Sequence, residues 1–212
     1  MARRAPVYIL EGTWWSNHEV PLILPYFHAL ATSHREIDLS HRTIRGADDI
    51  AYYVSKISRN AGAFLYFACH GKRQRLSPSD GRSTVAPEGL LEALSQAKAG
   101  AISFVHFGCC EMVAASARRQ THEKISQATG ARWVSGYTTH VGWLQSTLLD
   151  IALVSEVFVP DHQAKAKRER KLKPRAEQFI KNYEQLAREL GFSALAETSS
   201  GQLLFPERLH TA

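Results

Sequence analysis

Two strongly apolar segments constrain what this chain can fold into more than any other feature of its sequence. Ala63–Ala68 is a continuous apolar run, and Ile102–Phe107 is a second, largely apolar segment. A strand with one solvated face alternates apolar and polar residues, whereas a strand covered on both faces does not. We therefore expect both segments to be interior strands of a largely parallel sheet.

The rest of the chain alternates between short strand patterns and helical patterns. Strands are also expected at Pro6–Leu10, Arg35–Leu39, Arg132–Gly136 and Gln202–Phe205. The expected helices are Val20–Leu30, Asp48–Ile57, Pro87–Ala97, Met112–Ala128, Leu144–Phe158 and a long polar helix Gln163–Leu190 that is a candidate for a break at Pro174; a polar loop is expected over Lys72–Ser83. Such alternation predicts an α/β fold, a three-layer α/β/α sandwich around a mostly parallel sheet of about six strands.

The composition is that of a globular domain. Hydrophobic residues make up 44% of the chain and charged residues 22%, which suffices for a core and excludes the disordered class. We expect a single domain over residues 1–212, with a core at about 6–160 and a basic helical region with the final strand at about 161–206. The basic N-terminus precedes only a short apolar run, and no stretch approaches the roughly 18 apolar residues of a membrane span, so a cytoplasmic protein without a membrane partner is expected.

Both interior strands end in reactive residues. The first ends in Cys-His-Gly (residues 69–71) and the second in Gly-Cys-Cys-Glu (residues 108–111). The carboxyl ends of parallel strands form one edge of the sheet, where ligands of open α/β sheets bind, so His70 and Cys110 are expected at a common cleft. A thiolate is a strong nucleophile, and an imidazole takes its proton and later protonates a leaving amine. The pair therefore predicts a catalytic dyad.

Backbone amides at the same edge would complete this site. Gly71 and Cys110 are the expected donors to the oxyanion of a tetrahedral intermediate, and a glycine lets the substrate approach closely. An expected helix follows Cys110 at once, so its N-terminal dipole would favour the thiolate. Three cysteines, two of them adjacent, do not form a disulfide framework, so free thiols are expected. We expect neither a cofactor nor a metal ion.

Two motifs resemble those of caspase-like (clan CD) cysteine peptidases. Phe64–Gly71 (FLYFACHG) resembles the strand that ends in the catalytic His-Gly of caspases and CHAT-domain peptidases. Phe104–Glu111 (FVHFGCCE) resembles the strand that ends in the catalytic Ala-Cys-Glu of CHAT domains, and in that register Cys110 is the nucleophile. Arg132–Gly142 is more loosely similar to the caspase segment that lines the substrate groove. The resemblance, which spans residues 6–206 in topology, implies a caspase-like fold and an endopeptidase of regulated proteolysis or prokaryotic defence.

The resemblance also implies where a substrate would bind. Residues after the first, fourth and fifth expected strands would form the substrate-binding groove: Glu11, Gly108, Thr138, Thr139, Trp143 and Gln145. Caspases use arginines in the pocket for the aspartate before the scissile bond, and no arginine occupies the matching positions of this chain. Aspartate specificity is therefore not expected, and Glu11 is a candidate acceptor for a basic side chain.

Two chemical alternatives concern the same residues. Cys109 would replace Cys110 as the nucleophile if the strand end slipped by one residue. Zinc is the other alternative, although the spacing contains no ligand pair of the zinc-finger kind and adjacent cysteines rarely bind one ion. The candidate zinc ligands are Cys69, His70, His106, Cys109 and Cys110.

Several further residues are expected near the cleft without a catalytic role. Cys69 is expected in the core, and His140 is expected to be a bystander in the groove loop. Trp14 and Trp15 follow the first strand, where they would form a hydrophobic shelf for substrate, seal the domain against a partner, or pack in the core.

One stretch of the chain is strongly basic. Seven of the eleven residues of Lys165–Arg175 are Lys or Arg, and they carry much of the net charge of +6. A solvated helix face or connector is the ordinary interpretation, with nucleic-acid contact and a cleavage site as alternatives. The main hypothesis is a cysteine endopeptidase whose partners are a protein substrate and a regulatory protein; the alternative is an inactive scaffold that binds protein or nucleic acid.

Overall fold

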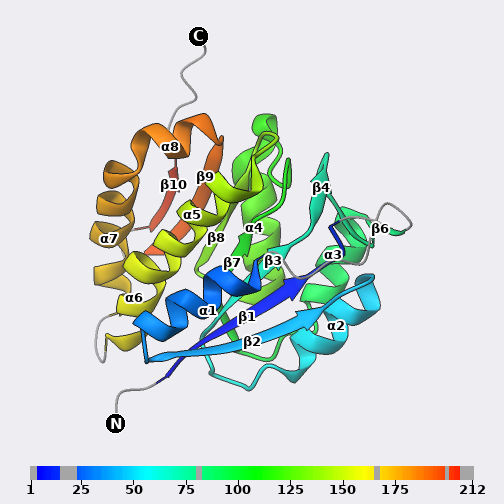
Figure 1. Ribbon diagram of the computed structural model, residues 1–212, viewed down its shortest axis with the longest axis horizontal. Helices are drawn as coiled ribbons and strands as arrows, with labels where there is room; N and C mark the ends of the chain where they lie inside the picture. The colour runs from blue at the N-terminus through cyan, green and yellow to red at the C-terminus, as the bar shows by residue number, and fades with distance from the viewer. Residues whose placement is uncertain (1–3, 15–22, 80–82, 165–167, 199–200, 206–212) are drawn as a thin grey trace.

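The computed structural model describes residues 4–14, 23–79, 83–164, 168–198 and 201–205 and shows an α/β protein (Figure 1). Its central sheet has seven strands, which in spatial order are β10 (Gly201–Phe205), β9 (Phe192–Thr198), β8 (Trp133–Tyr137), β7 (Ile102–Phe107), β3 (Ala63–Ala68), β1 (Ala5–Glu11) and β2 (Ile37–Thr43). In this spatial order, the neighbouring strands β8, β7, β3, β1 and β2 pair in parallel. Strands β9 and β10 add an antiparallel edge beside β8.

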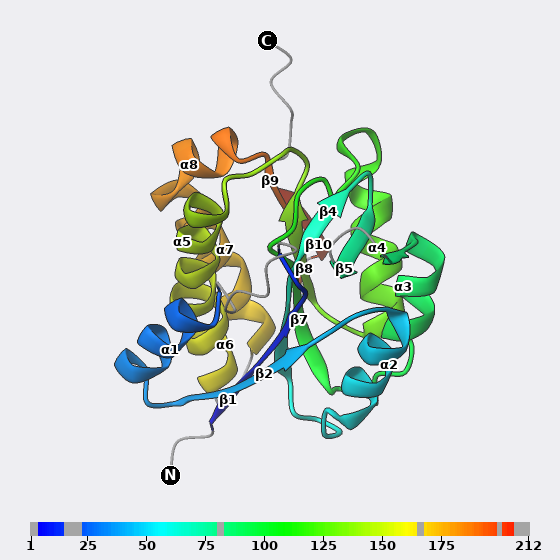
Figure 2. The same ribbon diagram turned by 45° about the vertical axis from the view of Figure 1, so that its right-hand side comes forward.

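Helices cover both faces of this sheet, which Figure 2 shows between two helical layers. One layer consists of α1 (Leu24–Ser33), α5 (Trp143–Leu153), α6 (Val159–Gln163), α7 (Arg168–Asn182) and α8 (Glu184–Glu189). The other layer consists of α2 (Ala47–Lys56), α3 (Pro87–Leu94) and α4 (Arg118–Thr129). The predicted three-layer α/β/α sandwich with a mostly parallel sheet is therefore confirmed.

The two interior strands are buried as their composition predicts. Every residue of β3 is buried, and successive side chains enter opposite layers: Phe64 and Tyr66 pack under α1 and α5, whereas Leu65 and Phe67 pack under α2 and α3. Strand β7 beside it has the same character and buries even the polar His106. Two separate hydrophobic cores thus hold β3 and β7 from both sides and fix where these strands end.

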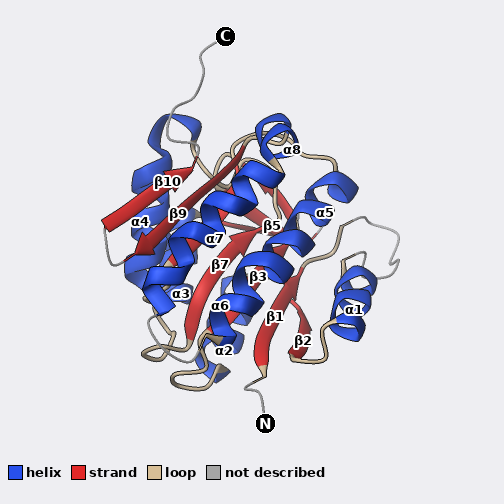
Figure 3. Cartoon of the chain, turned by 90° about the vertical axis from the view of Figure 1, so that its left-hand side faces the viewer, coloured by secondary structure: helices blue, strands red, loops and turns tan. Residues whose placement is uncertain are grey.

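The strongly apolar helix after β8 continues through a π-helical turn. Helix α5 leads into η2 (Val154–Phe158) and then α6 without a break, and Pro160 lies just after the wider turn. Figure 3 shows α5, α6 and α7 lying across the sheet. By length and composition, Trp143–Gln163 is the one helix in the described residues that reaches the dimensions of a membrane span. However, 56% of its apolar window is buried inside the protein, as in a core helix.

The sequence missed the ninth strand and a small second sheet. Phe192–Thr198 forms β9, although its alanines favour a helix, because it pairs with β8 and buries its first five residues. The expected polar loop Lys72–Ser83 contains most of a three-stranded sheet built from β4 (His70–Lys72), β5 (Arg75–Ser79) and β6 (Ser83–Val85). Small strands of this kind depend on tertiary contacts, which no local pattern encodes.

Helix boundaries also differ from the sequence-based expectations. Helix α4 begins at Arg118, after the 3₁₀ turn η1 (Ala115–Ala117), and not at Met112. The amides of Glu111 and Val113 instead donate to carbonyls of Thr139 and Tyr137, so this segment pairs with the chain that follows β8. The first part of Val20–Leu30, together with Trp15 and 165–167 of the basic stretch, lies outside the described residues.

The C-terminal helices differ from the single long helix that was expected. Pro174 lies inside α7 without ending it. The helix ends at Asn182 instead, and α8 begins at Glu184. Leu172, Ala176 and Phe179 are almost completely buried against the sheet, so α7 is a packed, amphipathic helix.

Candidate active site

The parallel register brings the ends of β3 and β7 to the same place. Phe67 lies opposite Phe107, so His70 and Cys110 are each three residues beyond the last paired position. Gly71 lies directly against the turn that carries the cysteine: a Cβ on Gly71 would collide with the carbonyl oxygen of Cys110 and lie 3.0 Å from Cβ of Cys109. The close approach of these two strand ends therefore requires glycine at position 71.

A backbone carbonyl orients the imidazole of His70. Its Nε2 lies 2.5 Å from the carbonyl oxygen of Trp14, and the Trp14 ring packs edge-on against it at a centroid distance of 5.3 Å. A carbonyl oxygen only accepts hydrogen bonds, so Nε2 must carry the proton. In the neutral ring the lone pair is then on Nδ1, which makes Nδ1 the basic atom of this exposed side chain.

Glu11 anchors the tryptophan that holds His70. Its carboxylate is 2% exposed and accepts the indole hydrogen of Trp14 at 2.9 Å and the amide hydrogen of Ile23 at 3.2 Å. His41 Nε2 lies 2.8 Å from the other oxygen. The structure therefore places Glu11 in the interior beneath Trp14, where it positions the His70 support.

Cys110 presents a half-buried sulfur to the start of α5. The amide of Val141 donates to Sγ at 3.4 Å, and the thiol is 3.8 Å from the Val141 carbonyl oxygen. Burial raises the pKa of the Cys110 thiol, the Val141 amide opposes that rise, and the neighbouring Cys109 and Glu111 add to it. The resting residue is consequently a neutral thiol, which needs a base to become a nucleophile.

The other two cysteines lie in the core. Cys109 Sγ is 3.3 Å from the carbonyl oxygen of Phe67 and 3.7 Å from the sulfur of Cys69, and both residues are buried. Burial, together with the adjacent Cys69, raises the pKa of Cys109 far above its ordinary value. Of the three cysteines, only Cys110 is partly exposed to solvent.

Glu111 clamps the cysteine turn from two sides, a role that the sequence did not indicate beyond its place in the Cys-Cys-Glu motif. The residue adopts a positive φ of 50°. Its carboxylate accepts the amide hydrogen of Arg73 at 3.1 Å and lies 3.1 Å from His140 Nε2. Its backbone bonds to Gln74 on one side and Thr139 on the other. His140, expected to be a bystander, thus contacts the clamp.

The predicted groove residues fall into two groups. Glu11 and Gly108 are buried, whereas Thr138 is partly exposed and Thr139 exposed, and the two threonine hydroxyls donate to the carbonyls of Gly191 and Leu190. Trp143 and Gln145, in contrast, lie partly exposed and exposed at the N-terminus of α5. Trp143 packs against the Tyr26 ring at a centroid distance of 5.8 Å.

The candidate zinc ligands do not converge. His106 is completely buried, with Nδ1 2.7 Å from the Ser135 hydroxyl and Nε2 2.6 Å from the Asp150 carboxylate. In the described part of the chain, no three His, Cys, Asp or Glu side chains are grouped as metal ligands. Neither a protein-family model nor a curated protein matches this sequence.

Proposed function

We propose that this protein is a cysteine endopeptidase in which Cys110 is the nucleophile and His70 the general base and acid. The observation that carries the proposal is the arrangement at the two strand ends. The partly exposed thiol of Cys110, held by the Val141 amide, is carried on a turn that lies against Gly71. Gly71 directly follows His70, whose Nε2 is fixed by the carbonyl of Trp14. His70 and Cys110 closely follow the ends of the buried strands β3 and β7, which fix the backbone from which both side chains project.

The reaction follows from these groups. Nδ1 of His70 takes the thiol proton as Sγ of Cys110 bonds to the scissile carbonyl carbon, and the carbonyl oxygen becomes an oxyanion. His70 then gives the proton to the leaving amine as the C–N bond breaks, which leaves a thioester. Water, deprotonated by His70, adds to the thioester and releases the carboxyl product and the free thiol.

The oxyanion would be held by backbone amides. Within the described part of the chain, no backbone carbonyl accepts a hydrogen bond from the Cys110 amide, which supports this amide as one proposed donor. Gly71 is the second proposed donor, as its missing side chain leaves room beside Cys110. Cys109 is buried under the strand end, which supports Cys110 rather than Cys109 as the nucleophile.

The substrate class is a protein or peptide, and a cytoplasmic setting fits three free thiols. The resemblance to caspase and CHAT-domain peptidases supports regulated proteolysis or prokaryotic defence, with a regulatory partner, as the biological context.

Covalent labelling with a peptidyl acyloxymethyl ketone tests the proposal. Wild-type protein should be labelled on Cys110, as located by peptide mass spectrometry. Cys110→Ala should abolish labelling, His70→Ala should slow it at least about tenfold, and Cys109→Ala should retain it as the matched control. Labelling that persists in Cys110→Ala would refute the assignment of Cys110 as the nucleophile. A folded wild-type protein that reacts with no such probe would favour the alternative of an inactive, binding scaffold.

A further inference from the structure

The hairpin that carries His70 places two positive charges on the same face as the imidazole. In β4 and β5, Gly71 and Leu76 are buried, whereas His70, Lys72 and Arg75 are exposed. Side chains alternate along a strand and paired residues share a face. Because Lys72 pairs with Arg75 and His70 with Ser77, the two cations share the outer face with the proposed acid–base residue.

The pairing of Lys72 with Arg75 across the hairpin reduces the stability of the folded protein. Like charges directly opposite each other on antiparallel strands destabilise the pair. The turn between them also uses Arg73 and Gln74 with φ of 48° and 64°, a conformation that two-residue hairpins normally assign to glycine or asparagine. Propensity therefore does not explain why this hairpin carries these residues.

No internal anion neutralises the hairpin within the described part of the chain. Lys72, Arg73 and Arg75 form no ion pair with any described carboxylate. The carboxylate of Glu111 accepts the backbone amide hydrogen of Arg73 and pairs with His140. That clamp ties the hairpin to the Cys110 turn, so the charges have a defined position relative to the nucleophile.

We propose that Lys72 and Arg75 recognise an acidic side chain of the peptide substrate on the leaving-group side of the scissile bond. The inference rests on the proposed function, in which His70 protonates the leaving amine and therefore contacts the C-terminal half of the substrate. Lys72 is two residues beyond His70, a separation of about 6.6 Å along a strand. An extended peptide covers that distance in about two residues, so Asp or Glu is preferred roughly one to three positions after the cleaved bond.

Peptide binding to Cys110→Ala tests this without turnover. The probes are two fluorescein-labelled decapeptides, one alternating Glu with Ser and the other Gln with Ser, compared by fluorescence anisotropy. The acidic peptide should bind about threefold to tenfold more tightly at low salt, and the difference should shrink as salt screens exposed charges. Lys72→Gln/Arg75→Gln in that background should abolish the difference.

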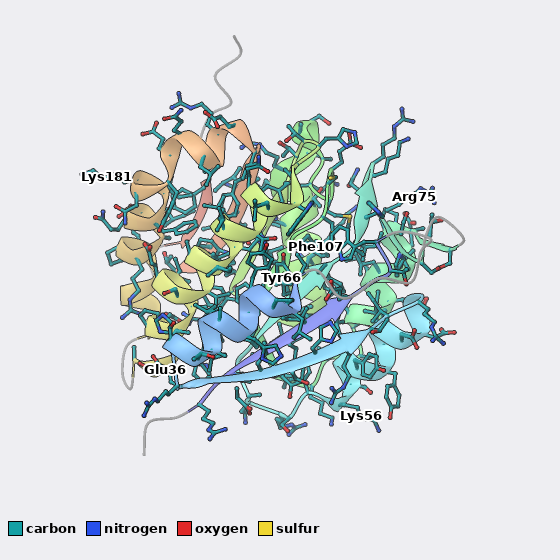
Figure 4. The ribbon with its side chains drawn as sticks, viewed as in Figure 1. Glu36, Lys56, Tyr66, Arg75, Phe107 and Lys181 are labelled. Carbon is teal, nitrogen blue, oxygen red and sulfur yellow. The ribbon has the colours of Figure 1, made fainter. Side chains whose placement is uncertain are left out.

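A second double variant supplies the matched control. Lys56→Gln/Lys181→Gln removes the same net charge, and Figure 4 shows Lys181 on the opposite side of the molecule from Arg75. This control should keep the preference for the acidic peptide. Equal binding of the two peptides, or a loss of preference as large in the control as in the hairpin variant, would overturn the proposal. If a single-stranded RNA dodecamer binds more tightly than the acidic peptide, the proposal that the hairpin recognises a peptide is wrong.

Cleavage of a peptide library by active protein separates the two proposals. Enrichment of Asp and Glu in the first three positions after cleaved bonds, lost in the hairpin variant, supports the specificity. Cleavage with no such enrichment refutes the hairpin inference and leaves the peptidase intact. Failure of Cys110 labelling refutes the peptidase, and with it the position relative to a cleaved bond, while the binding comparison still tests whether the hairpin prefers acidic peptides.

Discussion

The Asp150 carboxylate lies 2.6 Å from Nε2 of His106, and neither side chain reaches solvent. The same carboxylate accepts hydrogen bonds from Tyr66 at 2.7 Å and Tyr137 at 2.5 Å. With Ser135 on the other ring nitrogen of His106, these groups have the order of a hydrolase triad, but complete burial denies them a substrate. The network instead ties α5, which begins beside Cys110, to three strands of the sheet.

We expect Asp150→Asn to lower the free energy of unfolding by about 3 kcal/mol, because the new amide would face a buried donor that the carboxylate now accepts. Guanidinium denaturation measures the change. Tyr66→Phe, which removes one donor and leaves the carboxylate, should cost only about 1 kcal/mol. An Asp150→Asn variant as stable as wild type would show that the network does not hold α5.

Gly71→Ala should slow alkylation of Cys110 by more than about tenfold, because the added methyl group would displace the turn that carries the thiol. It should also destabilise the fold by about 1–3 kcal/mol through overpacking. The matched control is Gly89→Ala in α3, where a Cβ meets nothing within 4 Å. That variant should be neutral or more stable, with unchanged alkylation.

The pH dependence of Cys110 alkylation distinguishes a neutral resting thiol from a preformed ion pair. Burial raises the pKa of this thiol, and only the thiolate reacts. The iodoacetamide rate of Cys110, followed by mass spectrometry, should therefore still be rising at pH 9. Cys69 and Cys109 should remain unmodified in folded protein. A plateau below pH 8 would mean that the thiolate exists before substrate binds.

His122 should make the protein sensitive to acid. Burial, with smaller contributions from Arg118 and His106, lowers its pKa to about 3. The unfolded chain, with an ordinary histidine pKa of about 6.5, then binds a proton that the folded protein does not. This contribution to stability is complete above about pH 6.5 and is lost as pH falls toward 3, with a slope of up to about 1.4 kcal/mol per pH unit.

The pH profile of unfolding free energy, compared with that of His122→Gln, measures this effect. Between pH 6 and 4 the unfolding free energy of the variant should fall less steeply with pH than that of the wild type. The difference in slope should correspond to about one proton. Parallel profiles for the two proteins would contradict the assignment.

Arg175, the last residue of the basic stretch, has a structural role because it pairs with the buried Asp161. Asp161 is 1% exposed, forms an ion pair with Arg132, and lies 3.9 Å from Arg175. Asp161→Asn should cost about 3–5 kcal/mol because it leaves partly buried cations uncompensated. Arg175→Gln should cost more than Lys173→Gln, whose exposed pairing with Glu177 contributes at most about 0.5 kcal/mol. Thermal unfolding of the two glutamine variants compares them directly. Equal stabilities would show that Arg175 is only a solvated charge without a structural role.

Much of the framework was predictable from local patterns. Ala63–Ala68 and Ile102–Phe107 are strands with the predicted bounds, because a short, largely apolar segment without alternation is stable only where both faces are covered. The small sheet β4–β6 and strand β9 were not predictable, since their polar or alanine-rich residues become strands only through pairing with distant segments. The expected helix at Met112 was replaced by pairing with the chain after β8 for the same reason.

The sequence by itself determined the α/β layering and the strand ends after which His70 and Cys110 lie, because the apolar composition of each strand indicates that both of its faces are buried. Only the tertiary structure decided which sulfur is partly exposed, since Cys109 is turned to the carbonyl of Phe67 while Cys110 accepts a hydrogen bond from the amide of Val141, 31 residues away. It also decided that the carbonyl of Trp14 orients His70 and that Glu11 lies beneath it. Such contacts depend on register and on approach between remote segments, which no local pattern of residues specifies.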